Sequence, residues 1–174
     1  TSLGGAPFLL DAWGVDIAYS CSQKGLGCPP GASPLTLGSR AVEKLQRRST
    51  KVANWYLDMT LLSKYWGEER TYHHTAPINL YYALREALRL LAQEGIENSW
   101  QRHQKNVEYL WQRLEELGLS LHVEKQFRLP TLTTVRIPEG VDGKAVARQL
   151  LNEHDIEVGG GLGELAGQVW RIGL

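Results

Sequence analysis

The sequence predicts an α/β region followed by a small α+β domain, and three observations support this. Two short β-rich segments, 14–20 and 34–38, are brief enough to belong to a sheet that helices cover. Segments with helical patterns and marked ends follow them. After Gly118 the pattern changes to alternating and β-branched runs. The chain therefore combines a helix-covered α/β region with a second region that has its own small sheet.

Four helices are expected before Gly118, and particular residues mark their ends. Ser39 and Asp58 are candidate N-caps for the first two, since their side chains can accept from backbone N–H groups. Pro77 suits the first turn of the third helix, while Gly95 and Gly118 can end the third and fourth. The expected ranges are 39–48, 58–65, 78–93 and 96–117. We assign the apolar stripe of the fourth helix to the core: Trp100, Val107, Leu110, Trp111, Leu114 and Leu117.

The second region carries shorter elements. The strands that we expect are 119–123, 131–137, 156–158 and 169–172, with a helix over 143–153. The domain boundary is placed near Glu94 and Gly95, which gives domains over 1–94 and 95–174.

The composition is that of an ordinary globular chain. Nineteen basic and nineteen acidic side chains balance among 174 residues, so no net field favours nucleic acid or an anionic membrane. The apolar runs are too short to span a bilayer. Cys21 and Cys28 lack metal or redox spacing, and we expect incidental thiols. Because Thr1 is not methionine and the chain closes on an apolar run ending at Leu174, we expect a fragment of a longer polypeptide.

One lysine occupies an unusual loop. Lys24 lies within the segment YSCSQKGLGCPPG, residues 19–31, whose glycines and prolines favour tight turns and close backbone approach. A lone lysine is most often an exposed surface cation. At the edge of an α/β sheet, however, partial desolvation would favour a nucleophilic amine, which suits Schiff-base chemistry. A serine acyl-transfer motif is excluded, because the residue three before Lys24 is Cys21.

Five segments, taken together and in order, carry a family resemblance. They are 2–5, 22–24, 72–75, 159–163 and 169–174. They resemble the alanine–glyoxylate and serine–pyruvate aminotransferases, which are class V, fold-type I enzymes that use pyridoxal 5′-phosphate (PLP). The resemblance implies the C-terminal part of a PLP-binding large domain with a mainly parallel sheet, followed by a truncated small α+β domain.

The resemblance also implies roles for particular residues. Lys24 would be the catalytic Schiff-base lysine and, with Gln23, would contact the cofactor. Tyr72 and Thr75 would donate hydroxyls to the cofactor phosphate of a partner subunit, so the site would be shared across a homodimer. Arg171 would bind the substrate carboxylate with its planar guanidinium.

Other interpretations of these residues remain open at this point. Tyr72 could pack at a helix entrance, and Arg171 could be a strand arginine paired with an acid. His73 and His74 suggest a metal, but adjacent side chains point apart and no third ligand stands nearby, so no metal site is expected. The glycine turn is not a dinucleotide motif, because Glu164 occupies its last position.

The activity implied is transamination between a small amino acid, alanine or serine, and a 2-oxo acid, glyoxylate or pyruvate. The alternatives are a cysteine-desulfurase-like PLP enzyme and a non-catalytic, dimer-forming fragment. In the family, an aspartate and a phosphate-binding cup precede the segment that matches residues 1–3, so we expect the isolated chain to be inactive. No nucleic-acid or membrane partner is expected. The resemblance implies a cytoplasmic location, or a peroxisomal one in a eukaryote.

Overall fold

A computed structural model describes residues 2–174, which form two compact units. The first unit is Phe8–Arg89, and the second combines Ser2–Pro7 with Leu90–Leu174. The chain therefore passes between the units twice. The domain boundary expected at 94–95 stays a prediction about the complete fold.

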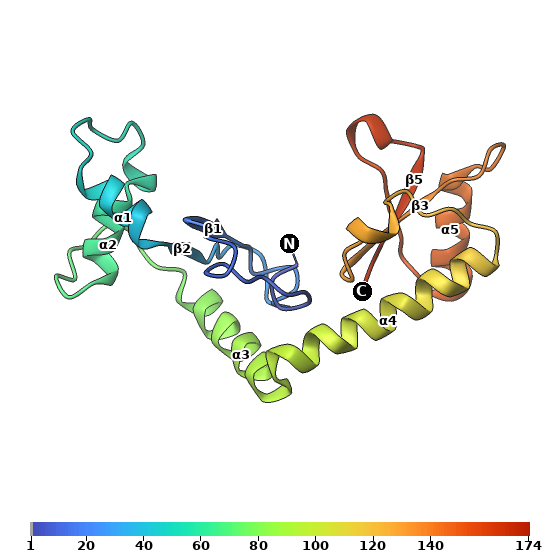
Figure 1. The fold of residues 1–174 in the computed structure, drawn as a ribbon, viewed down its shortest axis with the longest axis horizontal. Coiled ribbons are helices and arrows are strands. Elements are labelled where there is room, and N and C mark those ends of the chain that lie inside the picture. Colours follow the sequence, from blue (N-terminus) through green and yellow to red (C-terminus); the bar gives the residue numbers. More distant parts are fainter. Residues whose placement is uncertain (1) are drawn as a thin grey trace. The chain divides into compact units, whose positions relative to one another are not determined.

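The first unit holds one strand pair and three helices, which Figure 1 shows in blue to green. Its elements are β1 Ile17–Tyr19, β2 Leu35–Leu37, α1 Ser39–Gln46, a 3-10 turn Trp55–Leu57, α2 Met59–Trp66 and α3 Ile78–Glu94, whose last residues belong to the second unit. β1 and β2 pair antiparallel, with Tyr19 opposite Leu35. Ala18 faces inward and is buried, whereas Ile17, Tyr19 and Leu35 are exposed. One side of this strand pair is therefore apolar and open to solvent.

The second unit contains a three-stranded sheet and two helices (Figure 1). Its elements are α4 Ile96–Glu116, β3 Leu132–Arg136, α5 Gly143–His154, β4 Gly159–Gly160 and β5 Val169–Gly173, with short 3-10 turns at Lys125–Phe127 and Gly163–Leu165. The strand order is β3-β5-β4, and both pairs are antiparallel. β1 and β2 are antiparallel as well, so every named strand pair within residues 2–174 is antiparallel.

The helix ends follow the expected local chemistry, with one exception. Asp58 caps α2, since its carboxylate accepts from Thr60 N at 2.9 Å. Gly95, at φ 86°, separates α3 from α4, and Gly118, at φ 78°, follows the end of α4. Both glycines occupy backbone that residues with a Cβ rarely adopt. The prediction for Ser39 is wrong: Ser39 is the first helical residue, and Gly38 caps α1 without a side-chain bond.

Two expected strands are absent from their predicted places. Residues 119–123 form only an isolated bridge from Leu121 to Val135, and 156–158 are not a strand. The strand lies slightly later, where Gly159 and Gly160 pair with β5. Pairing with a neighbour, rather than β-rich composition, decides where this strand forms.

The register of β3 and β5 determines which side chains meet the helices. Thr133 lies opposite Ile172, and Val135 lies opposite Trp170, so these four share one face. Trp111 of α4 donates its indole N–H to Thr133 Oγ1 at 2.8 Å. The indole of Trp170 likewise donates to the Gly143 carbonyl at the start of α5, at 2.9 Å. Both helices therefore lie on this face of the sheet.

The core of the second unit includes part of the predicted stripe. Val107, Trp111, Val135 and Val169 are buried, which confirms two members of that stripe as core residues. The prediction that Leu117 is a core residue is wrong, because it is exposed at the end of α4, just before Gly118. No helix in residues 2–174 has both the length and the apolar character needed to cross a membrane.

Candidate active site

The loop that carries Lys24 is short and internally hydrogen-bonded. The carbonyl of Lys24 accepts from Gly27 N at 2.8 Å, and Gly27 has a φ of 65°, so residues 24–27 form a tight turn. Leu26 within the turn and Cys28 just after it are buried. Lys24 and its neighbour Gln23 are exposed. The buried residues hold the backbone of the loop, while the lysine amine faces solvent.

The hydroxyls of Tyr72 and Thr75 meet across one short segment before α3. Tyr72 Oη and Thr75 Oγ1 lie 3.1 Å apart. Tyr72 is 74% exposed, and its ring makes an edge contact with Tyr65 at 6.5 Å. Tyr72 is therefore not packed into a helix entrance in this chain. Two exposed hydroxyls that lie this close together can both donate hydrogen bonds to one anionic group.

Of the two residues between Tyr72 and Thr75, His73 is buried and fixes the segment in place. His73 is 5% exposed and stacks on the Trp55 indole, with ring centroids 4.1 Å apart and planes at 10°. Its Nε2 lies 3.3 Å from the Trp55 carbonyl oxygen, and its Nδ1 lies 2.9 Å from Nδ1 of His74. The expectation that the two histidine side chains point apart is wrong. Within residues 2–174 no group of three or more metal-ligating side chains includes them.

Arg171 occupies the face of the small sheet that lies away from the helices. It pairs with Thr134 of β3 and lies between Trp170 and Ile172 along β5, so its side chain points to the opposite face of the sheet from theirs. Its Nε donates to the Gly160 carbonyl at 2.6 Å. None of the ion pairs in residues 2–174 uses Arg171, so the alternative of an acid-paired strand arginine is not what these residues form. One edge of the guanidinium is fixed by the backbone, and the rest can bind a carboxylate.

The glycine turn before β5 fixes the position of Arg171. Gly161 N donates to the Val169 carbonyl at 3.0 Å, which closes the turn onto the start of β5. A Cβ on Gly161 would lie 1.9 Å from the Leu165 carbonyl oxygen, so only glycine fits. The turn thus supports the strand that carries the arginine, and no nucleotide-binding role is needed to explain its glycines.

The structure divides the predicted residues between its two units. Gln23 and Lys24 share one loop of the first unit, and Tyr72 and Thr75 share another. Arg171 belongs to the second unit. Sequence reasoning missed two supporting residues, Ser22 and His73, which are polar and buried. A polar residue inside each motif is the only signal that could have drawn attention to them.

Several groups on α3 and α4 have shifted pKa values, among them Tyr81 and Glu94. Burial, together with Tyr65 and Tyr56, raises the pKa of Tyr81 in α3. The hydrogen bonds from Arg102 lower the pKa of Glu94, with Nε–Oε1 at 2.5 Å and Nη2–Oε2 at 2.9 Å. The ion pair of Glu94 and Arg102 spans the junction at Gly95 and holds the end of α3 to the start of α4.

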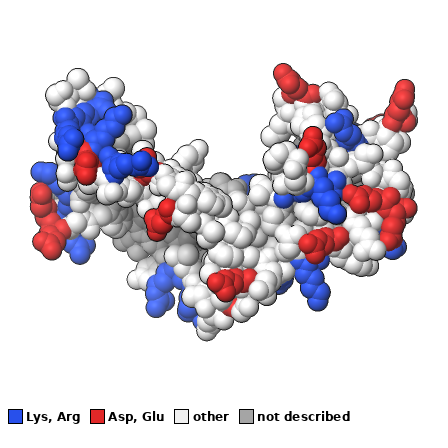
Figure 2. Space-filling view, in the orientation of Figure 1, with Lys and Arg blue, Asp and Glu red and all other residues white. Residues whose placement is uncertain are grey.

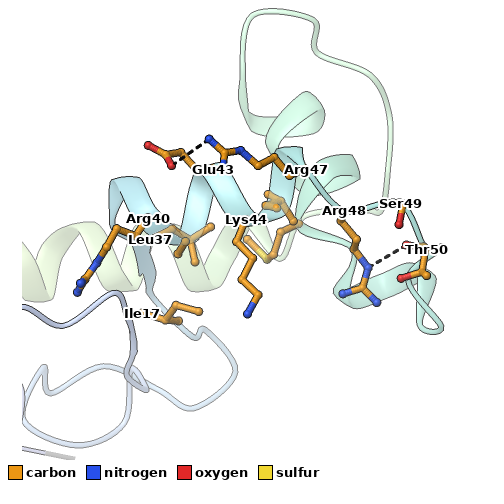
Figure 3. A pocket seen from close by; sticks show the side chains of 12 residues that line it. Ile17, Leu37, Arg40, Glu43, Lys44, Arg47, Arg48, Ser49 and Thr50 are labelled. Atoms are coloured by element: carbon orange, nitrogen blue, oxygen red, sulfur yellow. Dashed lines mark hydrogen bonds and ion pairs between the residues drawn. The ribbon is translucent and has the colours of Figure 1, made fainter.

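A separate hollow of about 640 Å³ opens beside α1 (Figure 3). Basic side chains line it and gather over α1 in the space-filling view (Figure 2). Arg40 pairs with Asp16 and Arg47 with Glu43, so part of this charge is neutralised. None of the predicted site residues lines the hollow.

Comparison with known proteins identifies the family. The model of the aminotransferase class-V family matches residues 1–167. Alanine–glyoxylate aminotransferase of Callithrix jacchus is 47% identical over 177 residues, which cover 99% of this chain and 43% of that protein. The Drosophila melanogaster protein of the same name is 43% identical over 99% of this chain and 45% of its own length. The chain thus spans less than half the length of these relatives.

Solved structures give the same result. A crystal structure of alanine–glyoxylate aminotransferase from Nostoc sp. is 83% identical, with a TM-score of 0.94 over 99% of this chain and 46% of that one. Ureidoglycine–glyoxylate aminotransferase from Bacillus subtilis is 36% identical, with a TM-score of 0.93 over 99% of this chain and 44% of that one. A cysteine desulfurase from Thermococcus onnurineus is 17% identical, with a TM-score of 0.73 over 100% of this chain and 46% of that one, which shows a common fold alone. The chain belongs to the class-V aminotransferase family.

Proposed function

We propose that the protein carrying these residues catalyses PLP-dependent transamination between alanine or serine and glyoxylate or pyruvate. The observation that carries the proposal is the 83% identity to the Nostoc alanine–glyoxylate aminotransferase over 99% of the chain. The resemblance first inferred from the loop of Lys24, the hydroxyl segment and the arginine strand agrees with it. We use the term parent protein for the longest natural polypeptide that carries these 174 residues.

The residues present fit the chemistry of PLP. Lys24 offers an exposed amine on a fixed loop, Tyr72 and Thr75 offer hydroxyl donors for a phosphate, and Arg171 offers a guanidinium with no acidic partner in residues 2–174. When bound, PLP supplies the electron sink that stabilises negative charge at the substrate Cα. We assign Gln23 to the side of the cofactor ring.

Each side chain then has a definite task. The Lys24 amine holds the cofactor covalently and, once released, moves the proton at the substrate Cα. Arg171 binds the carboxylate that amino acids and 2-oxo acids share, so it orients both substrates alike. Tyr72 and Thr75 would serve the cofactor phosphate of a second subunit, and the active protein would be a homodimer.

The alternative of a cysteine desulfurase needs a mobile, reactive cysteine. Cys28 is buried within the lysine loop, at 6% exposure, where its thiol has no freedom to reach a substrate. The desulfurase likeness is one of fold alone. Transamination is therefore the better supported function, and a non-catalytic, dimer-forming fragment is the alternative that an activity assay decides.

Covalent trapping tests the proposal. The parent protein is mixed with PLP, reduced with borohydride and digested, and mass spectrometry should find a pyridoxyl group on the peptide containing Lys24. The wild type should convert alanine and glyoxylate to pyruvate and glycine. Lys24→Ala should lose both the adduct and turnover, while Lys44→Ala, which removes an exposed lysine from α1, should keep both. Undiminished turnover in Lys24→Ala would contradict the proposal.

A further inference from the structure

The side chain of Ser22, two residues before Lys24, is fully buried, with 0% exposure. Its hydroxyl donates to the Pro29 carbonyl at 2.6 Å and accepts from Ala32 N at 3.3 Å. Its backbone N–H donates to the Ala32 carbonyl, and its carbonyl accepts from Cys28 N, both at 3.0 Å. One residue thus binds three positions on the far side of the lysine loop.

The hydroxyl takes the place of a bond that the backbone could make by itself. Pro29 O and Ala32 N are three residues apart, which is the spacing of the hydrogen bond that closes a β-turn. Ser22 Oγ instead bonds both groups. Without the hydroxyl, these two groups would lack partners in a site that is buried at Ala32 and partly buried at Pro29, or would close onto each other and pull the loop out of its present path.

Lys24 belongs to the part of the loop that these bonds hold in place. Between Ser22 and Cys28 the chain makes the turn that starts at Lys24 and ends at Gly27. The Lys24 side chain itself is exposed, so the backbone around the turn has to set where the amine starts. Fixing the base of the loop therefore narrows the range of positions open to the amine.

We propose that Ser22 is a positioning residue: its buried hydroxyl holds the loop 23–31 so that the Lys24 amine is placed for attachment of the cofactor. The inference rests on the proposed function, because it assumes that Lys24 is the attachment point. Ser22 itself does not touch cofactor or substrate in this account. Its effect should appear in the rate of attachment and in kcat, and not in the KM of either substrate.

The test uses the parent protein and a matched serine. Ser99 is 1% exposed, and its hydroxyl donates to the Gly4 carbonyl at 2.8 Å in the second unit. Ser22→Ala and Ser99→Ala each remove one buried serine hydroxyl and the two hydrogen bonds that it makes, so a general loss of stability should affect both. Ser22→Cys keeps a polar atom of similar shape with a weaker donor, and it replaces the alanine variant if that variant does not fold.

Two measurements separate positioning from stability. In apo protein, amide hydrogen exchange of the peptide 22–32 should speed up in Ser22→Ala and stay unchanged in Ser99→Ala. With PLP added, the rate of borohydride-trapped attachment at Lys24 should fall about 10- to 100-fold in Ser22→Ala alone, by analogy with the cost of misplacing a reacting group. Turnover should fall with it at unchanged KM, and Ser22→Cys should lie between Ser22→Ala and the wild type.

The outcomes distinguish the two proposals. If the wild type is trapped at Lys24 and Ser22→Ala attaches PLP as fast as Ser99→Ala, the positioning role is wrong while the proposed function stands. If the wild type itself gives no adduct at Lys24, the proposed function fails and the positioning role fails with it.

Discussion

A Cβ atom on Gly161 would lie 1.9 Å from the carbonyl oxygen of Leu165 and 2.6 Å from its carbonyl carbon. Both are backbone atoms, so they cannot move aside without breaking the turn that precedes β5. We expect Gly161→Ala to destabilise the parent protein by about 3 kcal/mol, at the upper end of ordinary overpacking. Urea unfolding at neutral pH measures this.

Gly159 supplies the control for that prediction. A Cβ there would approach Nη2 of Arg171 at 3.3 Å, which is the end of a flexible side chain. Gly159→Ala should therefore cost much less stability than Gly161→Ala. Equal losses would mean that the Leu165 contact is not what requires glycine.

Arg171→Lys should raise the KM of the amino donor and of the 2-oxo acid together. Both substrates present a carboxylate, and lysine cannot reproduce the two parallel hydrogen bonds of a guanidinium. The loss of one charge-assisted bond predicts an increase of about 10- to 100-fold. Arg136→Lys, an exposed arginine on the paired strand β3, serves as the control. If only one substrate responds, Arg171 is not the common carboxylate site.

His73→Ala should loosen the segment that holds Tyr72 and Thr75. It removes a buried ring stacked on Trp55, which for aromatic truncations costs roughly 3–5 kcal/mol when burial is complete. Retention of PLP by the parent protein should weaken, as equilibrium dialysis would measure. His73→Phe keeps the stack and loses the hydrogen bonds, so it should fall between alanine and wild type. If His73→Phe retains PLP no better than His73→Ala, the stack on Trp55 is not what holds the segment.

The bond between Glu94 and Arg102 predicts an acid-dependent stability. Because Arg102 lowers the pKa of Glu94 in the folded state, the contribution is present above the ordinary glutamate pKa of 4.5. It is lost as the pH falls through the lowered folded value. A double-mutant cycle with Glu94→Gln and Arg102→Gln should give a favourable coupling at pH 7 that declines below pH 4.5. A coupling that does not change with pH would show that the pair is not ionic.

The 174-residue chain expressed alone should fold poorly and hold no PLP. Ile17, Tyr19 and Leu35 present an apolar face to solvent on β1 and β2, and large exposed faces of this kind require a cover. We expect a broad thermal transition, binding of a hydrophobic dye and no transaminase activity. A sharp cooperative melt with a yellow, borohydride-sensitive absorbance band would refute this.

Local chemistry explains which parts of the fold could be predicted from the sequence. The cap at Asp58 and the break at Gly95 depend on side chains and backbone conformations within a few residues. The strand at Gly159 and Gly160 could not be predicted, since glycine has low β-propensity and the strand exists only because β5 lies beside it.

The site shows the same division. Lys24 and Arg171 could be proposed from the sequence as site residues, because their motifs carry chemistry that few residue types can supply. Ser22 and His73 were missed because their partners lie 7 to 18 residues away along the chain, and only the folded path brings them together. The hydrogen bond between the two adjacent histidines also depends on that path.

The bond from Ser99 to Gly4 has a consequence for the order of synthesis. The two residues are 95 positions apart, and ribosomes add about 5–20 residues per second, so Gly4 waits roughly 5–20 s for its partner. During most of that time the ribosome is adding the intervening unit, Phe8–Arg89, so Ser2–Pro7 cannot yet join the unit to which it belongs. Until then this segment cannot form its bond to Ser99, and conditions that slow translation should prolong its exposure to chaperones and proteases.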